Sequence, residues 1–253
     1  MTDTALHQPH TSSTAARFWA LIPCAGAGAR AGATGPKQYQ ALAGRPLVAH
    51  TLAAFAATPG LAGILVVVAP GDTTLEDQGL AESVHVADCG GASRAASVGA
   101  GLGVLHTLGA QPQDWVLVHD AARCLITPAQ IQRLMAACAD DAVGGLLAQP
   151  LADTLKVGTA GRVSATLERS DKWLAQTPQM FRLAPLQQAL QASGPGVTDE
   201  ASAIEAQGLQ PLLVAPEGAN FKVTYPDDFA LAEAVLRARQ AALAAPATPR
   251  EAA

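Results

Sequence analysis

The chain has 253 residues, of which 49% are hydrophobic, and its 16 basic and 21 acidic residues give a formal net charge of −5. The apolar content is sufficient for one large core, and without a basic run the chain lacks the signature of a nucleic-acid-binding surface. No apolar stretch reaches the roughly 18 residues of a membrane helix.

We expect a cytoplasmic protein, because the N-terminus has no apolar segment for secretion. Four cysteines without a CxxC pair are typical of reduced thiols rather than of a zinc or redox site. The predicted organisation is a flexible leader over residues 1–17, a single domain over 18–242 and a flexible tail over 243–253.

Strand-like and helix-like patterns alternate along the chain. Short apolar runs predict strands, and apolar residues spaced three and four apart predict helices. The predicted strands cover 18–23, 64–69, 84–87, 116–119, 145–148, 212–215 and 222–224, and the predicted helices cover 46–57, 93–108, 128–139 and 227–242. This alternation indicates a Rossmann-like α/β fold: an open, mostly parallel sheet between two helix layers. Ligands of such sheets bind beyond the carboxyl ends of the strands.

One segment departs from this alternation. Residues 153–170 show period-two patterning on both sides of Gly158-Thr159-Ala160-Gly161, which predicts a protruding β-hairpin arm. An isolated two-stranded ribbon is marginally stable in water. We therefore expect the arm to pack against the same arm of a second subunit and form a homodimer. The alternative is a flap folded onto its own domain.

The first predicted strand runs into a glycine-rich loop, and residues 23–40 read PCAGAGARAGATGPKQYQ. Glycines allow the backbone to present N–H groups to an anion, and Arg30 and Lys37 add two positive charges. The loop is therefore a candidate cradle for a nucleoside triphosphate. A dinucleotide fingerprint is the alternative, but Pro36 stands where that motif needs a helix, and the first acidic residue after the loop is Asp72. An ordinary strand-to-helix turn would not need both cations.

Further polar residues follow the predicted strands. Gly90-Gly91-Ala92-Ser93-Arg94 precedes a helix whose N–H groups could hold a base or a phosphate, with Ser97 one turn further on. Asp120 ends the strand WVLVHD and is a candidate ligand for Mg²⁺, which shares hard carboxylate oxygens with substrate phosphates. A helix cap before Pro128 is the alternative role for Asp120. Three more polar clusters lie at 177–179, 198–200 and 222–224, and the second of them is typical of a helix start.

Seven motifs follow one another along residues 18–238: PCAGAGAR…GPKQY, GGASRAASV, VHDAAR, DTLK, QTPQMF, TDEASA and FKVT. In these motifs and their order the chain resembles the 2-C-methyl-D-erythritol 4-phosphate cytidylyltransferase family. The resemblance implies a nucleotidyltransferase of the non-mevalonate isoprenoid precursor pathway. Such an enzyme transfers CMP from CTP to 2-C-methyl-D-erythritol 4-phosphate, giving 4-diphosphocytidyl-2-C-methyl-D-erythritol and pyrophosphate. A ribitol 5-phosphate cytidylyltransferase and a non-catalytic nucleotide-binding regulator are the alternatives.

The resemblance also implies roles for single residues. The residues implied to bind the nucleotide are Pro23, Ala25, Gly26, Gly28, Gly91, Arg94, Ser97 and Ala121. Those implied to bind the polyol phosphate are Asp120, Arg123, Thr154, Arg169, Thr177, Thr198 and Lys222. The implied catalytic residues are Arg30, Lys37, Arg169 and Lys222, with Mg²⁺ or another divalent cation on Asp120. Thr154 and Arg169 would reach across the dimer. Ala92 and Cys124 depart from the family pattern, in which an acidic residue and a proline are usual.

Overall fold

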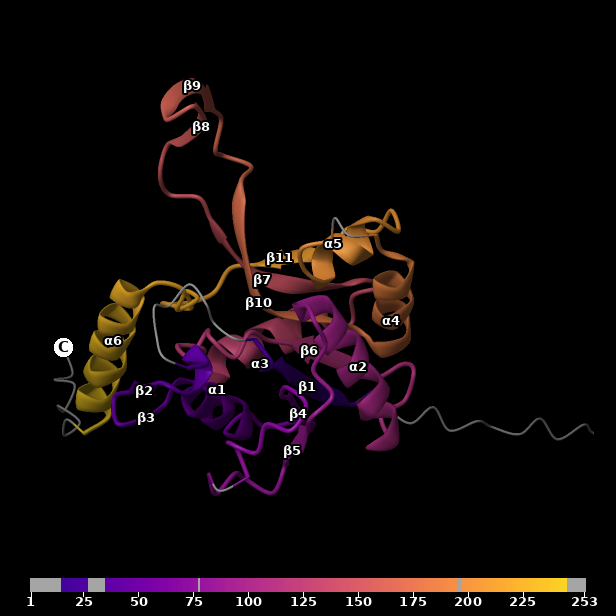
Figure 1. The fold of residues 1–253 in the computed structure, drawn as a ribbon. Helices are drawn as coiled ribbons and strands as arrows, with labels where there is room; N and C mark the ends of the chain where they lie inside the picture. Colours follow the sequence, from indigo (N-terminus) through magenta and orange to yellow (C-terminus); the bar gives the residue numbers. More distant parts are fainter. Residues whose placement is uncertain (1–14, 27–34, 77, 195–196, 245–253) are drawn as a thin grey trace, which may run out of the picture.

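A seven-stranded sheet forms the centre of the computed structural model, which describes residues 15–26, 35–76, 78–194 and 197–244 (Figure 1). The strand order is β11-β7-β10-β6-β1-β4-β5. In chain order these strands are β1 (Phe18–Pro23), β4 (Leu61–Val67), β5 (Val84–Ala87), β6 (Trp115–Val118), β7 (Gly144–Pro150), β10 (Trp173–Arg182) and β11 (Leu212–Val214). Within this sheet β10 runs antiparallel to both neighbours, and the other pairs are parallel. The predicted open, mostly parallel sheet is confirmed.

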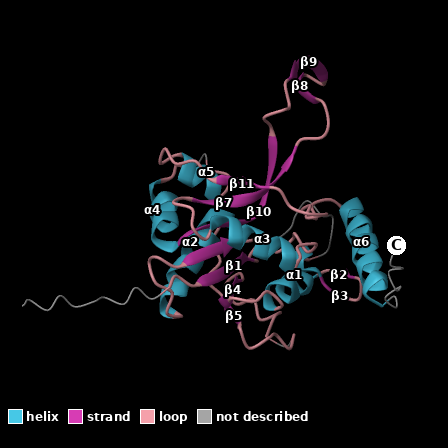
Figure 2. Cartoon of the chain, turned by 180° about the vertical axis from the view of Figure 1, so that it is seen from behind, coloured by secondary structure: helices cyan, strands magenta, loops and turns pink. Residues whose placement is uncertain are grey.

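Helices cover both faces of the sheet, as Figures 1 and 2 show. One face packs against α1 (Leu47–Ala56) and α3 (Pro128–Cys138), and the other against α2 (Arg94–Thr107), α4 (Leu183–Ala192) and α5 (Glu200–Glu205). Successive side chains of a strand point to opposite faces of the sheet. Leu21 therefore packs on the face covered by α2, α4 and α5, and Ile22 on the face covered by α1 and α3. Both are fully buried. The predicted three layers are therefore confirmed.

A third apolar cluster lies beside α1 and holds the C-terminal helix α6 (Pro226–Ala244) against the short strand β2 (Ala41–Leu42), which pairs with β3 (Arg45–Pro46). Val223 is completely buried in this cluster and donates its N–H to the carbonyl oxygen of Ala122. The strand predicted over 222–224 is wrong, because this segment joins no strand in the sheets of the described residues. It is instead an extended loop that carries the chain past the end of β6. Among the helices of the described ranges, none combines the length and apolarity needed to cross a membrane.

The predicted arm is present and projects away from the main sheet (Figure 1). Its strands β8 (Leu155–Thr159) and β9 (Arg162–Leu167) form a separate two-stranded sheet. The turn between them places Ala160 and Gly161 at φ values of 49° and 75°. Two consecutive positive φ values are the geometry of a tight hairpin turn that matches strand twist. The arm connects the end of β7 to the start of β10, where Pro150 lies opposite Trp173.

Candidate active site

Two adjoining cavities open at the edge of the sheet where β1, β5 and β6 end, which is the edge that the fold predicts for ligands. The larger has a volume of about 640 Å³ and the smaller about 190 Å³. The start of the glycine loop, the Lys37 turn and the first turn of α2 line the larger cavity. The smaller lies between the loop after β6, the middle of β10 and the start of α5. Arg94, Asp120 and Lys222 line both, and thus form a shared wall.

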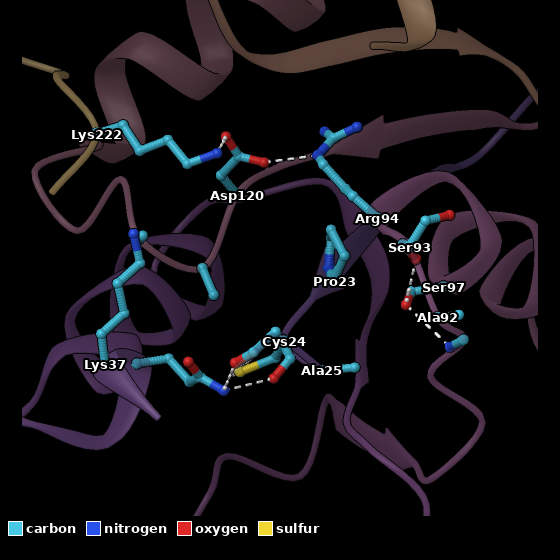
Figure 3. A pocket seen from close by; sticks show the side chains of 15 residues that line it. Pro23, Cys24, Ala25, Lys37, Ala92, Ser93, Arg94, Ser97, Asp120 and Lys222 are labelled. Atoms are coloured by element: carbon cyan, nitrogen blue, oxygen red, sulfur yellow. Dashed lines mark hydrogen bonds and ion pairs between the residues drawn. The ribbon is translucent and has the colours of Figure 1, made fainter. Parts of the chain in front are cut away.

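Asp120 is the centre of this wall (Figure 3). Arg94 Nε lies 2.8 Å from its Oδ1, Lys222 Nζ lies 2.9 Å from its Oδ2, and Arg123 Nε is 3.6 Å from the same Oδ2. Burial alone would raise the pKa of Asp120, but the charges of Arg94 and Lys222 outweigh it and hold the pKa well below its usual range. Asp120 is thus an ionised carboxylate among three cations. Its alternative role as a helix cap is wrong, because Thr127 caps α3.

Arg94 lies between the two cavities and bonds two carboxylates on different elements. Its two terminal nitrogens lie 2.6 and 2.9 Å from the carboxylate oxygens of Glu200, a bidentate pair, while its Nε bonds Asp120. Glu200 is almost completely buried at the start of α5, where Asp199 is the N-cap. The arrangement ties α2, the end of β6 and α5 together. Sequence reasoning read the Thr198-Asp199-Glu200 cluster correctly as a helix start, but it did not identify Glu200 as the partner of Arg94.

The turn η2 (Lys37–Tyr39) holds the start of the glycine loop, residues 24–26. Gln38 Nε2 donates to the carbonyl oxygens of Cys24 and Gly26, at 2.8 and 3.0 Å. Lys37 Nζ donates to the carbonyl oxygen of Val223 at 2.7 Å, so the Lys37 side chain contacts the segment that carries Lys222. Burial raises the pKa of the Cys24 thiol to about 12, which leaves it protonated and unreactive at neutral pH.

The first turn of α2 is closed by Ser97. The Gly91 N–H donates to Ser97 Oγ at 3.1 Å, and this hydroxyl donates to the carbonyl oxygen of Ser93 at 3.0 Å. A Cβ at Gly91 would lie 2.6 Å from the Cβ of Ala96, so a side chain there would clash. Ser97 therefore shapes the rim of the larger cavity around a glycine that the packing requires.

Thr177 and His119 order the loop that carries Asp120. The Asp120 N–H donates to Thr177 Oγ1 at 3.0 Å, and the same oxygen lies 3.1 Å from His119 Nδ1. Because Thr177 has one hydroxyl hydrogen, we assign that hydrogen to Nδ1 and the imidazole proton to Nε2, which lies 3.2 Å from the carbonyl oxygen of Arg123. Burial lowers the pKa of His119 to about 3, so the ring is neutral. Sequence reasoning did not single out His119.

Most of the predicted site residues are brought together. Those lining the larger cavity are Pro23, Ala25, Gly26, Lys37, Gly91, Arg94, Ser97, Asp120, Ala121 and Lys222. Those lining the smaller are Arg94, Asp120, Arg123, Thr177, Thr198 and Lys222. Thr154 and Arg169 are exposed at the base of the arm and are not among the residues that line these two cavities. Gly28 and Arg30 lie outside the described residues.

Comparison with known proteins identifies the family. The family model of 2-C-methyl-D-erythritol 4-phosphate cytidylyltransferase (IspD) matches residues 18–238. The chain belongs to the IspD family. This IspD chain is 63% identical over 247 residues to the bifunctional enzyme IspD/IspF of Albidiferax ferrireducens, of which it spans 59% of the length and which matches 97% of this chain. It is 56% identical over 233 residues to the 2-C-methyl-D-erythritol 4-phosphate cytidylyltransferase of Ralstonia nicotianae, with 87% of this chain and 92% of that protein covered.

Solved structures place the IspD chain in the same family. A crystal structure of 4-diphosphocytidyl-2C-methyl-D-erythritol synthase matches it with a TM-score of 0.79 and 38% identity, over 87% of this chain and 99% of the other. The enzyme of Francisella tularensis matches with a TM-score of 0.73 and 33% identity, over 86% and 98% of the two chains. The fold and family of this IspD chain, and the matched range of residues 18–238, therefore agree with the expectation from sequence.

Proposed function

We propose that this chain transfers CMP from CTP to 2-C-methyl-D-erythritol 4-phosphate and releases pyrophosphate, with CTP in the larger cavity and the polyol phosphate in the smaller. Membership of the cytidylyltransferase family gives the reaction class. The observation that carries the arrangement is the shared wall of Arg94, Asp120 and Lys222. Two phosphorylated molecules bound on its two sides would meet at a cluster of cations.

The reaction needs positioning and charge stabilisation more than a nucleophilic side chain. A phosphate oxygen of the acceptor attacks the α-phosphorus of CTP, and the bond from that phosphorus to the pyrophosphate oxygen breaks. Lys222 and Lys37 are tethered at one side of the larger cavity (Figure 3), where negative charge would develop on the phosphoryl oxygens. Fixed cations that act on developing charge are the main catalytic device of phosphoryl transfer. We propose the same role for Arg30.

The residues present fit a divalent cation that arrives with the nucleotide. Asp120 is the one carboxylate among the described residues that line the larger cavity, and those residues contain no cluster of three acidic, His or Cys ligands. Mg²⁺ commonly uses one or two carboxylates together with substrate phosphate oxygens. We propose that Asp120 holds the ion, which would neutralise phosphate charge. Both of its oxygens are paired with cations, so a bound ion would compete with Lys222 or Arg94 for Asp120.

We also propose that the arm makes the protein a homodimer. Val157, Val163 and Leu167 are exposed on its two strands, with 38%, 66% and 44% of their surface accessible. Apolar side chains on a projecting ribbon with no core of its own favour burial against a second copy. Arg169 and Thr154 at the arm's base would then complete the smaller cavity of the partner.

We assign the protein to the cytoplasm, because its four cysteines are unpaired and three of them are buried.

A matrix of nucleotides and acceptors tests the proposed function. CTP, UTP and ATP would each be incubated with 2-C-methyl-D-erythritol 4-phosphate or ribitol 5-phosphate, with and without Mg²⁺, and pyrophosphate release would be measured. We expect turnover with CTP, 2-C-methyl-D-erythritol 4-phosphate and Mg²⁺ together, at least about tenfold above every other combination. Faster turnover with ribitol 5-phosphate than with 2-C-methyl-D-erythritol 4-phosphate would identify the enzyme as a ribitol 5-phosphate cytidylyltransferase. The absence of pyrophosphate release from all combinations would favour the non-catalytic regulator.

A further inference from the structure

Gln38 follows Lys37 in η2, lines the larger cavity and contacts the start of the glycine loop. Its side chain is buried, with 6% of the residue exposed, and Nε2 donates to the carbonyl oxygens of Cys24 and Gly26. These carbonyls are two residues apart, as they are on one side of an extended segment. An amide NH₂ group carries two hydrogens, so one side chain satisfies both oxygens. The sequence reading used Gln38 only as part of a motif and gave it no role.

These two bonds fix the direction of a neighbouring N–H group. In a planar trans peptide the C=O of Cys24 and the N–H of Ala25 point in opposite directions. Because the Cys24 carbonyl is turned toward Gln38, the Ala25 N–H is turned away from it. Ala25 lines the larger cavity, and its N–H makes no hydrogen bond within the described part of the chain.

Packing holds Ala25 from its other side. A Cβ added at Gly90 would lie 2.3 Å from the Cβ of Ala25 and 2.6 Å from the carbonyl oxygen of Val68. The backbone at Gly90 therefore approaches the methyl group of Ala25 more closely than any side chain would permit. Gln38 and Gly90 together leave the 24–26 backbone little freedom to rotate.

We infer that Gln38 is a positioning residue for the nucleotide: it holds the 24–26 backbone so that the Ala25 N–H faces the cavity and can donate to an anionic oxygen of a nucleoside triphosphate. Gln38 acts through peptide groups, because its own donors are taken by two carbonyl oxygens. The inference rests on the proposed function, since it assigns the larger cavity to CTP. It requires an amide donor at this position, whereas simple packing would require only a side chain of similar size.

The test compares Gln38→Met and Gln38→Glu with Gln40→Met. Methionine keeps the length of the side chain and removes both donors, and glutamate adds a charge facing two carbonyl oxygens. Gln40 is a matched control, because its Nε2 is buried two residues away and makes no hydrogen bond within the described residues. For each variant, the dissociation constant of CTP with Mg²⁺ would be measured by calorimetry, and both KM values by pyrophosphate release.

We expect Gln38→Met to weaken CTP binding about tenfold, the scale of two lost neutral hydrogen bonds, and Gln38→Glu to weaken it further. The KM for the polyol phosphate should stay within about twofold, and Gln40→Met should match the unchanged chain. Equal CTP binding by Gln38→Met and Gln40→Met would overturn the inference. So would an equal rise of both KM values in Gln38→Met with a lowered melting temperature, since that pattern indicates a structural role. An unchanged chain without CTP binding or turnover would instead overturn the proposed function, and the inference with it.

Discussion

At Asp120, each carboxylate oxygen faces a different cation, Arg94 on one side and Lys222 on the other. The two cations differ in what else they bond. Arg94 is additionally held by both oxygens of Glu200, whereas the side chain of Lys222 is 37% exposed at the cavity. A phosphate group entering the site would therefore draw Lys222 toward itself more easily than Arg94. We infer that the ion pair with Asp120 fixes the position of the Lys222 ammonium group until substrate binds.

Lys37 should contribute mainly to the chemical step. Replacing Lys37 by alanine is expected to lower kcat by roughly 10² to 10³-fold, the scale of losing one preorganised donor to developing charge. Steady-state pyrophosphate release would measure the effect. Arg237→Ala removes the same charge from an exposed position on α6 and should leave kcat unchanged. If the turnover of Lys37→Ala stays within threefold of the unchanged chain, Lys37 does not stabilise the transition state.

His119 predicts a pH dependence of folding stability. Its pKa of about 3 in the folded state lies below the ordinary value near 6.5 of an unfolded chain, so below pH 6.5 the unfolded state binds an extra proton. Stability should therefore fall as pH falls, by about 2 kcal/mol between pH 7 and pH 5 from this residue alone.

Urea denaturation of the unchanged chain and of His119→Gln at both pH values would isolate this contribution. The variant should lose about 2 kcal/mol less between the two pH values than the unchanged chain does. His106→Gln, at an exposed position of α2, is the control and should behave as the unchanged chain. A slope that is the same in all three proteins would show that His119 does not titrate on unfolding.

Sequence reasoning predicted neither the strand β10 nor the helix α4, and the patterns in β10 show why a strand can be missed. Pro178 and a run of polar residues, Gln176 to Gln179, interrupt the alternation that identifies a strand. The structure accommodates them with a register shift between Ala175 and Gln179, and Thr177 uses its side chain to accept the Asp120 N–H. Buried parallel strands and amphipathic helices could be predicted because their apolar spacing is local. A strand whose polar residues serve the site carries no such local signal.

The same limit applies to the site. Polar clusters at the ends of predicted elements, together with the family resemblance, predicted most residues of the two cavities, because the carboxyl ends of parallel strands converge in any such fold. The partners Glu200, His119 and Gln38 could not be assigned, because each contact joins segments brought together only by tertiary packing. The structure thus adds the residues that hold the cavity-lining side chains and backbone in place.

The pairing of α5 with α2 predicts a stability effect. Glu200→Gln keeps the side-chain shape but removes the charge opposite Arg94, and we expect it to lower the free energy of unfolding by about 3 kcal/mol. Glu205→Gln makes the same change at an exposed position in the same helix and should have no effect. Urea titration would measure both. A loss of less than about 0.5 kcal/mol in Glu200→Gln would mean that Arg94 is held without this pair.

At the scale of the whole molecule, the proposed dimer predicts complementation between two impaired variants, assayed at a polyol phosphate concentration far below the KM of Arg169→Ala. Lys37→Ala damages the body of a subunit and Arg169→Ala damages its arm. If each arm serves the partner's cavity, a mixed dimer has one doubly damaged site and one intact site. Random mixing should then restore about a quarter of the activity of the unchanged protein, because half of the dimers carry one good site of two.

Co-expression with two different tags would supply the mixed dimer, and pyrophosphate release would report its activity. Arg169→Ala alone should raise the KM for the polyol phosphate and leave the KM for CTP unchanged. No recovery in the mixed dimer would indicate that each arm serves its own subunit. A rise in the KM for CTP would contradict the assignment of Arg169 to the polyol phosphate.

The wall of Arg94, Asp120 and Lys222 borders both cavities, and this has a thermodynamic consequence. A ligand that pulls Lys222 from Asp120 on one side alters the charge seen by a ligand on the other. Under the proposed assignment, CTP would change the affinity for the polyol phosphate by some factor, and linkage requires that the polyol phosphate change the affinity for CTP by the same factor. The two substrates would then be recognised as a pair, and an inhibitor of either half would bind differently to an enzyme already carrying the other.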